Sequence, residues 1–291
     1  MTRVLVTGAR GLLGSTLVPH LQARGHTVLR LGRAGEVEVR ADLCDVDQVF
    51  RALDKAKPDV IMNLAALADV DECERSTQSA YLMNVRIVEN LADWIKRSGT
   101  HCHLIQISTD QVYDGAGPHA ETDIRLTNFY GFSKYAGELA AAVVPSTILR
   151  TNFFGPSRCP GRTSLSDWLV QALTNGDAIT VFDDARFSPL SLQHLAELLE
   201  PLVEKRLPGI YNLGSAHGMS KADFAFALAE VLGLPTANMR RGNSGQAALT
   251  AYRPQDMRMD SLRFETAFGV RLPALSEEIQ SMKAAYARKA S

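Results

Sequence analysis

The chain has 291 residues, of which 46% are hydrophobic and 22% charged, a composition typical of a globular protein with a sizeable core. Its 31 basic and 32 acidic residues give a net charge of −1, whereas nucleic-acid-binding proteins normally carry a basic excess. The balance argues against a nucleic-acid partner. We find no signal peptide and no apolar run long enough to cross a membrane, so we expect a cytoplasmic protein without a membrane partner.

The first 150 residues alternate between short apolar runs and longer amphipathic stretches. The short runs are rich in Val, Ile, Leu and Thr, and they predict strands at residues 4–7, 27–31, 60–64, 104–108 and 147–150. Apolar residues at helical spacing predict helices at residues 12–23, 46–56, 80–96 and 130–142. This alternation requires crossover connections, which place parallel strands in one sheet covered on both faces. The predicted fold class is α/β, with a Rossmann-type doubly wound parallel sheet.

The pattern changes after residue 150. Residues 152–162 contain two glycines and two prolines and predict a loop. Later helices are predicted at residues 166–173, 192–203 and 223–232, and strands at residues 179–182 and 210–213. The mixture predicts a smaller, interleaved α/β lobe in residues 151–291, with a return to the main sheet at roughly residues 176–215.

The cysteines give little sign of a metal site or a disulfide framework. The four of them lie far apart and form no C-x-x-C pair: Cys44, Cys73, Cys102 and Cys159. His101 and His103 flank Cys102, but apolar residues follow at once. We therefore expect this segment to lead into a buried strand, and we expect no metal.

A glycine pattern, G-x-x-G-x-x-G, follows the first predicted strand at Gly8, Gly11 and Gly14. Gly8 allows the tight turn, Gly11 lets the backbone approach a pyrophosphate, and Gly14 lets helix and strand pack closely. The helix N-terminus then offers free N–H groups and a positive dipole end to the phosphates. We expect this loop, with Arg10 and Leu12, to bind a dinucleotide.

The end of the second strand indicates which dinucleotide. NAD-binding chains usually carry Asp or Glu there, to bind the ribose hydroxyls. Gly32 occupies that position, Arg33 follows it, and Arg10 lies inside the glycine loop. Two guanidinium groups without a carboxylate suit a 2′-phosphate, so the sequence favours NADP(H) over NAD(H), although solvated surface arginines remain an alternative. Asp42 and Leu43 are expected near the adenine.

A Y-x-x-x-K pattern, Tyr130 and Lys134, opens a predicted helix. Residues four apart share one helical face, so both side chains can point at one ligand. A phenol has a reference pKa of about 10, and a nearby ammonium would lower it. Tyr130 could then act as a general acid in reduction and as a base in the reverse direction. Ser108 and Thr109 end a strand where open α/β sheets bind ligands, and Thr109 can hydrogen-bond the reacting oxygen.

With these motifs the chain resembles the extended short-chain dehydrogenases/reductases, and within them the dTDP-4-dehydrorhamnose reductase (dTDP-L-rhamnose synthase) group, over nearly its whole length. Besides the glycine loop, the family-like segments are Asn63-Leu64-Ala65-Ala66, Val70-Asp71-Glu72-Cys73-Glu74, Ser108-Thr109-Asp110, Val112-Tyr113-Asp114-Gly115, Tyr130-Gly131-Phe132-Ser133-Lys134, Ile148-Leu149-Arg150-Thr151 and Arg253-Pro254. The resemblance implies a catalytic triad of Thr109, Tyr130 and Lys134. It also implies that Tyr130 and Lys134 contact the cofactor, Lys134 through the nicotinamide ribose, and that Ala65 and Ala66 line it.

The resemblance further implies an NADPH-dependent carbonyl reductase of the dTDP-rhamnose biosynthesis type, which reduces a 4-keto group on a nucleotide-activated deoxysugar. Residues 1–150 would then form the NADP(H)-binding domain, and residues 151–291 mainly the substrate-binding lobe. Asp110 and Gln111 are expected at the substrate. Gln111 departs from the aromatic residue common in such reductases, and it cannot supply the acid that related 4,6-dehydratases carry there.

Further predictions concern the second lobe, the alternative functions and the oligomeric state. Arg253 is expected to bind the sugar-nucleotide diphosphate, with Arg158 or Arg162 as candidate helpers, and Trp168 to line the pocket or pack in the core. The alternatives to a reductase are an epimerase of the same family and a non-catalytic NADP-binding subunit resembling the beta subunit of methionine adenosyltransferase. Family analogy also suggests a homodimer.

Overall fold

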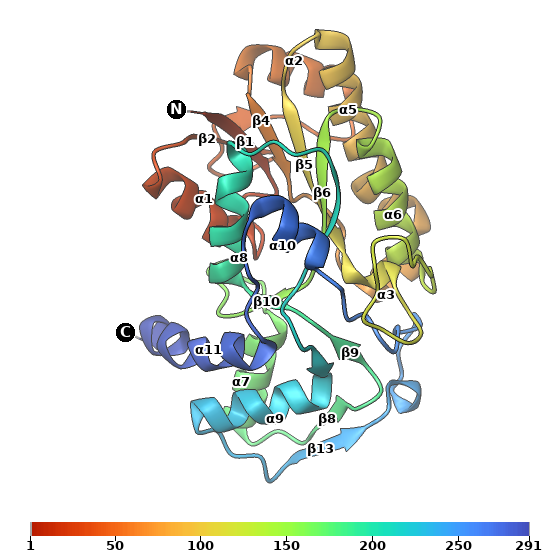
Figure 1. Cartoon of the computed structure of the whole chain (residues 1–291), viewed down its shortest axis with the longest axis vertical. Helices are drawn as coiled ribbons and strands as arrows, with labels where there is room; N and C mark the ends of the chain where they lie inside the picture. Colours follow the sequence, from red (N-terminus) through yellow and green to blue (C-terminus); the bar gives the residue numbers. More distant parts are fainter. Residues whose placement is uncertain (1, 291) are drawn as a thin grey trace.

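The structure is a computed structural model that describes residues 2–290, with side chains described up to residue 288. At its centre lies a seven-stranded parallel sheet in the order β11-β6-β5-β4-β1-β2-β3 (Figure 1). Its strands are β1 (Arg3–Thr7), β2 (Thr27–Gly32), β3 (Val39–Arg40), β4 (Val60–Asn63), β5 (His103–Thr109), β6 (Ser146–Thr151) and β11 (Gly209–Leu213). Because β4, β5 and β6 are buried along their whole length, they read as apolar runs rather than alternating patterns. The predicted Rossmann-type α/β class is confirmed.

Two apolar clusters cover the two faces of this sheet. On one face pack α1 (Gly14–Ala23), α8 (Leu192–Leu199), η3 (Glu200–Val203) and α10 (Leu262–Phe268). On the other pack α2 (Val46–Ala56), α5 (Ile87–Ser98) and α6 (Phe129–Ala141). The apolar faces of these helices form the core that fixes the carboxyl ends of the strands in place.

A third apolar cluster forms the small lobe, drawn at the bottom of Figure 1. It contains α7 (Leu165–Asn175), α9 (Lys221–Leu232) and α11 (Leu275–Ala290). Two strand pairs flank them, β8 (Ile179–Phe182) with β13 (Met239–Gly242) and β9 (Arg186–Phe187) with β12 (Met219–Ser220). At its centre, the ring of Phe224 packs edge-on against Phe154 and Phe187, with ring centroids 4.8 and 5.4 Å away.

The structure differs from the expected elements in three places. Strand β8 pairs with β13 in the small lobe, so residues 179–182 do not belong to the main sheet. The chain returns to the main domain only at β10 (Leu190–Ser191), which pairs with β7 (Phe153–Phe154). The first helix begins at Gly14 because the preceding residues form the glycine turn. The helix expected at 80–96 is divided among α4 (Thr77–Tyr81), the π-helical turn η1 (Leu82–Arg86) and α5, and α3 (Val70–Arg75) precedes it.

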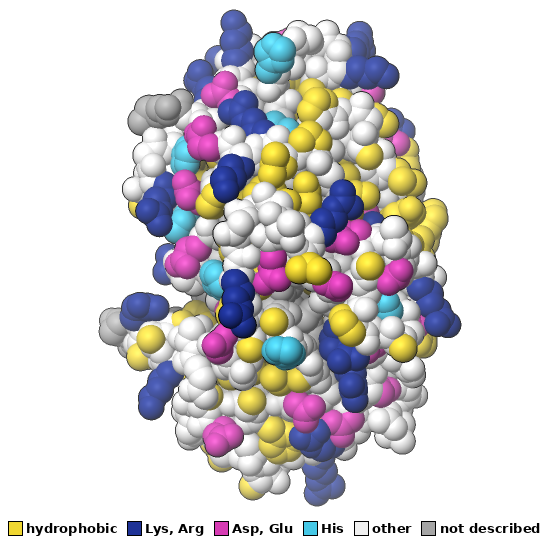
Figure 2. All heavy atoms as spheres, in the orientation of Figure 1, with side chains coloured by type: hydrophobic (Ala, Val, Ile, Leu, Met, Phe, Trp, Pro, Cys, Tyr) yellow, Lys and Arg dark blue, Asp and Glu magenta, His cyan; other side chains and the backbone are white. Residues whose placement is uncertain are grey.

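The surface agrees with the near-zero net charge. On the face shown in Figure 2, side chains of both signs are interspersed rather than segregated. Within residues 2–290, no helix is both long and apolar enough to span a membrane.

Candidate active site

The glycine loop packs directly against the end of β4. Gly8 has a φ of +61°, and a Cβ placed on it would lie 2.8 Å from the backbone of Leu64 and Ala65. Only glycine fits such a backbone conformation and such a close approach. The Thr7 hydroxyl accepts hydrogen bonds from the backbone N–H groups of Leu64 and Ala65, both at 3.1 Å. The structure thus brings the predicted Gly8 and Ala65 side by side, with Ala66 next along the chain.

Arg10 extends from this loop to the end of β2. Its Nη1 donates to the carbonyl of Ala34 at 3.3 Å, and its guanidinium lies against Gly35. Arg10 makes no ion pair within the described part of the chain. Arg33 differs, because it is 68% exposed and lies 3.9 Å from the Asp42 carboxylate. Asp42 therefore lies at the edge of the same region, whereas the Leu43 side chain is buried in the core between the sheet and α2.

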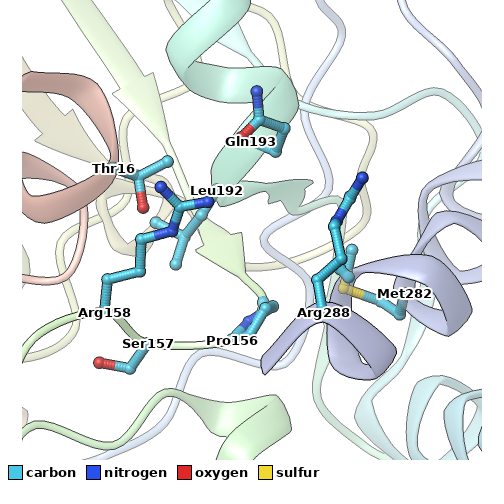
Figure 3. A pocket seen from close by; sticks show the side chains of 10 residues that line it. Thr16, Pro156, Ser157, Arg158, Leu192, Gln193, Met282 and Arg288 are labelled. Atoms are coloured by element: carbon cyan, nitrogen blue, oxygen red, sulfur yellow. The ribbon is translucent and has the colours of Figure 1, made fainter. Parts of the chain in front are cut away.

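The loop after β7 covers the side of the glycine loop. The Cys159 thiol donates to the carbonyl of Arg10 at 2.7 Å, and Arg158 and Arg162 line a cleft together with Arg10. Figure 3 shows a neighbouring cavity of about 320 Å3, into which Arg158 and Arg288 extend from opposite sides. The two candidate helper arginines thus lie beside the dinucleotide loop.

The predicted triad gathers at the carboxyl end of β5. Tyr130 and Lys134 lie on α6, whose first turn is capped by the Asn128 side chain, which accepts from the Gly131 N–H at 2.7 Å. The Thr109 side chain acts on the Tyr130 hydroxyl and lowers its pKa. Lys134 Nζ donates to the backbone carbonyl of Ile107 at 2.7 Å. All three side chains of the predicted triad are buried, so they meet in a site with little water.

Burial sets the protonation states here. Burial raises the pKa of Tyr130 well above its ordinary value, and Thr109 lowers it only in part. The expected lowering of this pKa by Lys134 is therefore wrong for the protein by itself, because desolvation of the phenolate is the largest effect and the nearby Asp110 carboxylate raises the pKa further. Burial also lowers the pKa of Lys134 to about 8, which the Glu138 carboxylate partly opposes. At neutral pH the site thus holds a neutral phenol beside a mainly charged amine.

Asp110 and Lys221 bring the two lobes together at the site. Asp110 is 1% exposed, and its carboxylate accepts from Asn152 Nδ2 at 2.7 Å. Burial raises its pKa to about 6, against the opposing effects of Asn152 and Lys221. Lys221 begins helix α9 in the small lobe and lies with its ammonium 5.9 Å from the Phe187 ring centroid. Its Nζ makes no hydrogen bond or salt bridge to any residue that the structure describes, which leaves it available to a ligand.

The other predicted substrate residues have different surroundings. Gln111 follows Asp110 and accepts from Asn128 Nδ2 at 3.1 Å, so it lies at the start of α6. Arg253 forms a two-pronged ion pair with Asp71 of α3, at 2.8 and 3.1 Å, so it links the lobes. Trp168 lies on α7 with 42% of its surface exposed. Among the described residues, Trp168 makes no side-chain hydrogen bond or ring contact with Thr109, Tyr130 or Lys134.

Sequence reasoning missed Asn84, Asn152 and Lys221. Asn84 lies in the π-helical turn, is 1% exposed and donates to the Ser133 hydroxyl at 2.9 Å, beside Lys134. Single-turn π-helices often occur at functional sites, but no sequence pattern marks this one. Lys221 could have been noticed in the sequence, because a cation in the first turn of a helix interacts unfavourably with the helix dipole.

These residues fit a nicotinamide dinucleotide. The positive φ and close packing of Gly8 form a cradle that a larger side chain would fill. The Arg10 guanidinium has no acidic partner in residues 2–290 and lies where the second strand ends. The Thr151 hydroxyl, in register with Thr109 across the sheet, is buried and has no hydrogen-bond partner among the residues that the structure describes. A polar ligand at the strand ends would satisfy it.

A parallel α/β sheet with a glycine loop after its first strand and a Tyr–Lys helix beside it defines a nicotinamide-dependent oxidoreductase of the short-chain type. The model of the RmlD substrate binding domain matches residues 1–288, so the chain belongs to that family.

Two relatives and one solved structure place the chain more closely. A dTDP-4-dehydrorhamnose reductase of Aggregatibacter actinomycetemcomitans is 32% identical over 98% of this chain and 99% of its own. Methionine adenosyltransferase 2 subunit beta of Danio rerio is 29% identical over 90% of this chain and 84% of its own. The crystal structure of dTDP-4-dehydrorhamnose reductase from Bacillus anthracis in complex with NADP has a TM-score of 0.87, at 24% identity over 97% of this chain and 98% of that one. The sequence-based assignment to this group is confirmed.

Proposed function

We propose that this protein is an NADPH-dependent reductase of a 4-keto group on a nucleotide-activated deoxysugar. The observation that carries the proposal is the burial of Tyr130 and Lys134 of α6 at the carboxyl end of β5, where Thr109 is also buried and Lys134 Nζ donates to the Ile107 carbonyl. The reductases named among its relatives support the substrate class.

Each group of the site has a chemical task in this proposal. When bound, NADPH supplies a hydride to the carbonyl carbon. The glycine loop, Ala65 and Ala66 would hold the dinucleotide. Tyr130, neutral at physiological pH because of its raised pKa, donates the proton from its hydroxyl to the carbonyl oxygen. The Thr109 hydroxyl orients that oxygen.

Lys134 stabilises the phenolate that Tyr130 becomes. Its ammonium lies one helical turn away on the same face of α6. Because its pKa is about 8, the amine is mostly charged at pH 7 and increasingly neutral above pH 8. The reductase activity should therefore decline as the pH rises through this range.

The substrate would lie between the lobes. Asp110 can accept a hydrogen bond from a sugar hydroxyl, and Lys221 can donate one. The Asp110 carboxylate and the Lys221 ammonium attract each other but lie too far apart to form a salt bridge. Arg253 is already paired with Asp71, so we propose that it serves mainly to hold the small lobe against α3. The cofactor side is assigned to residues 1–150 with the returning β11 and α8, and the remaining segments to the substrate.

The preference for NADP(H) is part of the proposal. It is supported by the unpaired Arg10 and by the NADP complex of the Bacillus anthracis reductase. The cytoplasmic location and the homodimer stay predictions.

The test follows NADPH absorbance with a dTDP-4-keto-6-deoxy sugar. Tyr130→Phe should lower the rate about 100-fold or more, because general acid catalysis contributes that much. Tyr135→Phe, on the same helix, should keep most of the activity and serves as the matched control. Full activity in Tyr130→Phe, or failure of every 4-keto sugar tried, would overturn the proposal.

The second candidate is a binding subunit without catalysis, which the relationship to methionine adenosyltransferase 2 subunit beta favours. It would bind NADPH tightly, would not oxidise NADPH with any sugar tested, and would change the activity of a partner enzyme. An epimerase would convert a nucleotide sugar without net consumption of NADPH. The same absorbance assay, followed by analysis of the sugar product, separates all three.

A further inference from the structure

The cavity shown in Figure 3 lies where α1, α8, α11 and the loop after β7 meet. Its volume of about 320 Å3 falls within the range of small-molecule sites in proteins. The residues that line it include none of Thr109, Tyr130 and Lys134, and none of the glycine loop. The proposed reduction therefore does not account for this cavity.

One buried polar group of the lining lacks a partner. Thr16, in the first turn of α1, is 5% exposed, and its hydroxyl points into the cavity in Figure 3. The hydroxyl makes no hydrogen bond to any residue that the structure describes. Buried hydroxyls normally have a hydrogen-bond partner, because burying a polar group without one costs free energy. A ligand in the cavity would supply the missing partner.

The charged side chains that line the cavity are positive. Arg158, from the loop after β7, and Arg288, from α11, extend into it from opposite sides. Arg158 forms no ion pair with a described residue, and no Asp or Glu among residues 2–288 lines the cavity. The carboxylate of Glu278, one turn before the cavity on α11, is already paired with His194. Guanidinium groups bind phosphate through paired, charge-assisted hydrogen bonds, so the cavity suits an anion of this kind.

The remaining wall of the cavity is largely apolar. Leu192 of α8 and Met282 of α11 are each 2% exposed, and Pro156 lines the cavity with them. Gln193 is polar, but its Nε2 already donates to Glu197 at 2.9 Å. A ligand with an apolar group would cover this wall and gain from removing it from water. The cavity therefore fits an organic phosphate better than inorganic phosphate.

We propose that this cavity is a second binding site, which holds a small organic phosphate. The phosphate group binds the Arg158 guanidinium and the Thr16 hydroxyl, and the apolar part of the ligand packs against Leu192 and Met282. The site is separate from the proposed reduction of a sugar, but it adjoins the dinucleotide loop. Helix α1 follows that loop directly, and the Cys159 thiol, next to Arg158, donates to a carbonyl of the loop at 2.7 Å.

The experiment titrates the full-length protein with phenyl phosphate at about pH 8, where a phosphate ester is a dianion. Binding is measured by ligand-observed nuclear magnetic resonance, and a ligand of this size should have a dissociation constant on the order of 1 mM. Phenol has the same ring without the charge and should bind at least about tenfold more weakly. Inorganic phosphate lacks the ring and should also bind more weakly than phenyl phosphate.

Two variants test the groups that would hold the phosphate. Arg158→Ala should raise the dissociation constant about tenfold or more, because hydrogen bonds to a charged group are lost. Thr16→Val keeps the shape of the side chain and removes only the hydroxyl, so it should raise the constant about threefold. Arg162→Ala is the matched control, because Arg162 is an exposed arginine of the same loop that lines the neighbouring cleft but not this cavity. It should leave the constant within about twofold of the wild type.

A further variant distinguishes this cavity from the dinucleotide site. Arg10→Ala removes the unpaired arginine of the glycine loop and should leave phenyl phosphate binding unchanged. A dissociation constant that rises in Arg10→Ala but not in Arg158→Ala would overturn the inference, as would the absence of phenyl phosphate binding. These titrations contain neither NADPH nor a sugar. Their failure would leave the proposed reductase intact, and failure of the reductase assay would leave this site intact.

Discussion

Replacing Arg10 with alanine should weaken NADPH binding while leaving NADH binding almost unchanged. The Arg10 side chain reaches from the glycine loop to the turn after β2, where its Nη1 donates to the Ala34 carbonyl at 3.3 Å and its guanidinium lies against Gly35. Its neighbours Arg30 and Arg33 pair with Glu38 and Asp42, whereas Arg10 has no acidic partner in residues 2–290. A 2′-phosphate bound there would receive charge-assisted hydrogen bonds from Arg10.

The size of the effect follows from the exposure of the site. Hydrogen bonds to a charged group contribute about 1.5–3 kcal/mol, and solvent screening at an exposed arginine reduces this to about 1–2 kcal/mol. The dissociation constant for NADPH should therefore rise roughly 5- to 30-fold in Arg10→Ala. Fluorescence titration with both dinucleotides measures the effect, with Arg33→Ala as the control, because Arg33 is 68% exposed and lies near Asp42. Equal losses for NADPH and NADH would show that Arg10 supports the loop rather than the 2′-phosphate.

Three other perturbations have definite expected results. Gly14→Ala would place a Cβ 2.5–2.6 Å from the backbone of the glycine loop. The free energy of unfolding, measured in urea, should fall by about 2–3 kcal/mol. Gly245→Ala is the control and should change this free energy little, because a Cβ there would have open space around it. Lys221→Met should raise KM for the sugar nucleotide about tenfold, because a hydrogen bond from a charged donor is lost. It should also move the acid limb of the pH profile to higher pH, because Lys221 lowers the pKa of Asp110. An unchanged KM would show that Lys221 does not contact the substrate. Burial lowers the pKa of His103 from 6.5 to about 4, so as the pH falls the imidazole binds a proton in the unfolded chain before it does so in the folded protein. The free energy of unfolding should therefore fall by about 2 kcal/mol between pH 7.5 and pH 5. His103→Gln should abolish this loss.

The parts of the fold that depend on local periodicity could be predicted from the sequence. The apolar runs predict six of the seven main-sheet strands, including the last one, β11, at Gly209–Leu213. The two-residue strand β3 was missed because it is too short to carry a pattern. The π-helical turn was missed because its extra residue changes hydrogen bonding without changing composition.

The site residues that belong to local motifs could likewise be predicted from the sequence, whereas those that depend on packing could not. Glycine spacing and Y-x-x-x-K are local, so Gly8, Tyr130 and Lys134 could be found without coordinates. Lys221 lies more than a hundred residues from Asp110, and only the packing of the small lobe shows that they face each other. The pKa of Tyr130 could not be foreseen, because local sequence shows charged neighbours but not the depth of burial.

The return of the chain to the main domain after β10 limits how the protein can be divided. Residues 192–213 supply both a helix that covers one face of the sheet and the edge strand β11, and helix α10 adds to the same apolar cluster. A fragment ending at residue 150 would leave β6 as an open edge and expose the apolar side of α1 to water. Neither half of this molecule is therefore a self-sufficient folding unit, and insertions that preserve function belong in its surface turns rather than between its lobes.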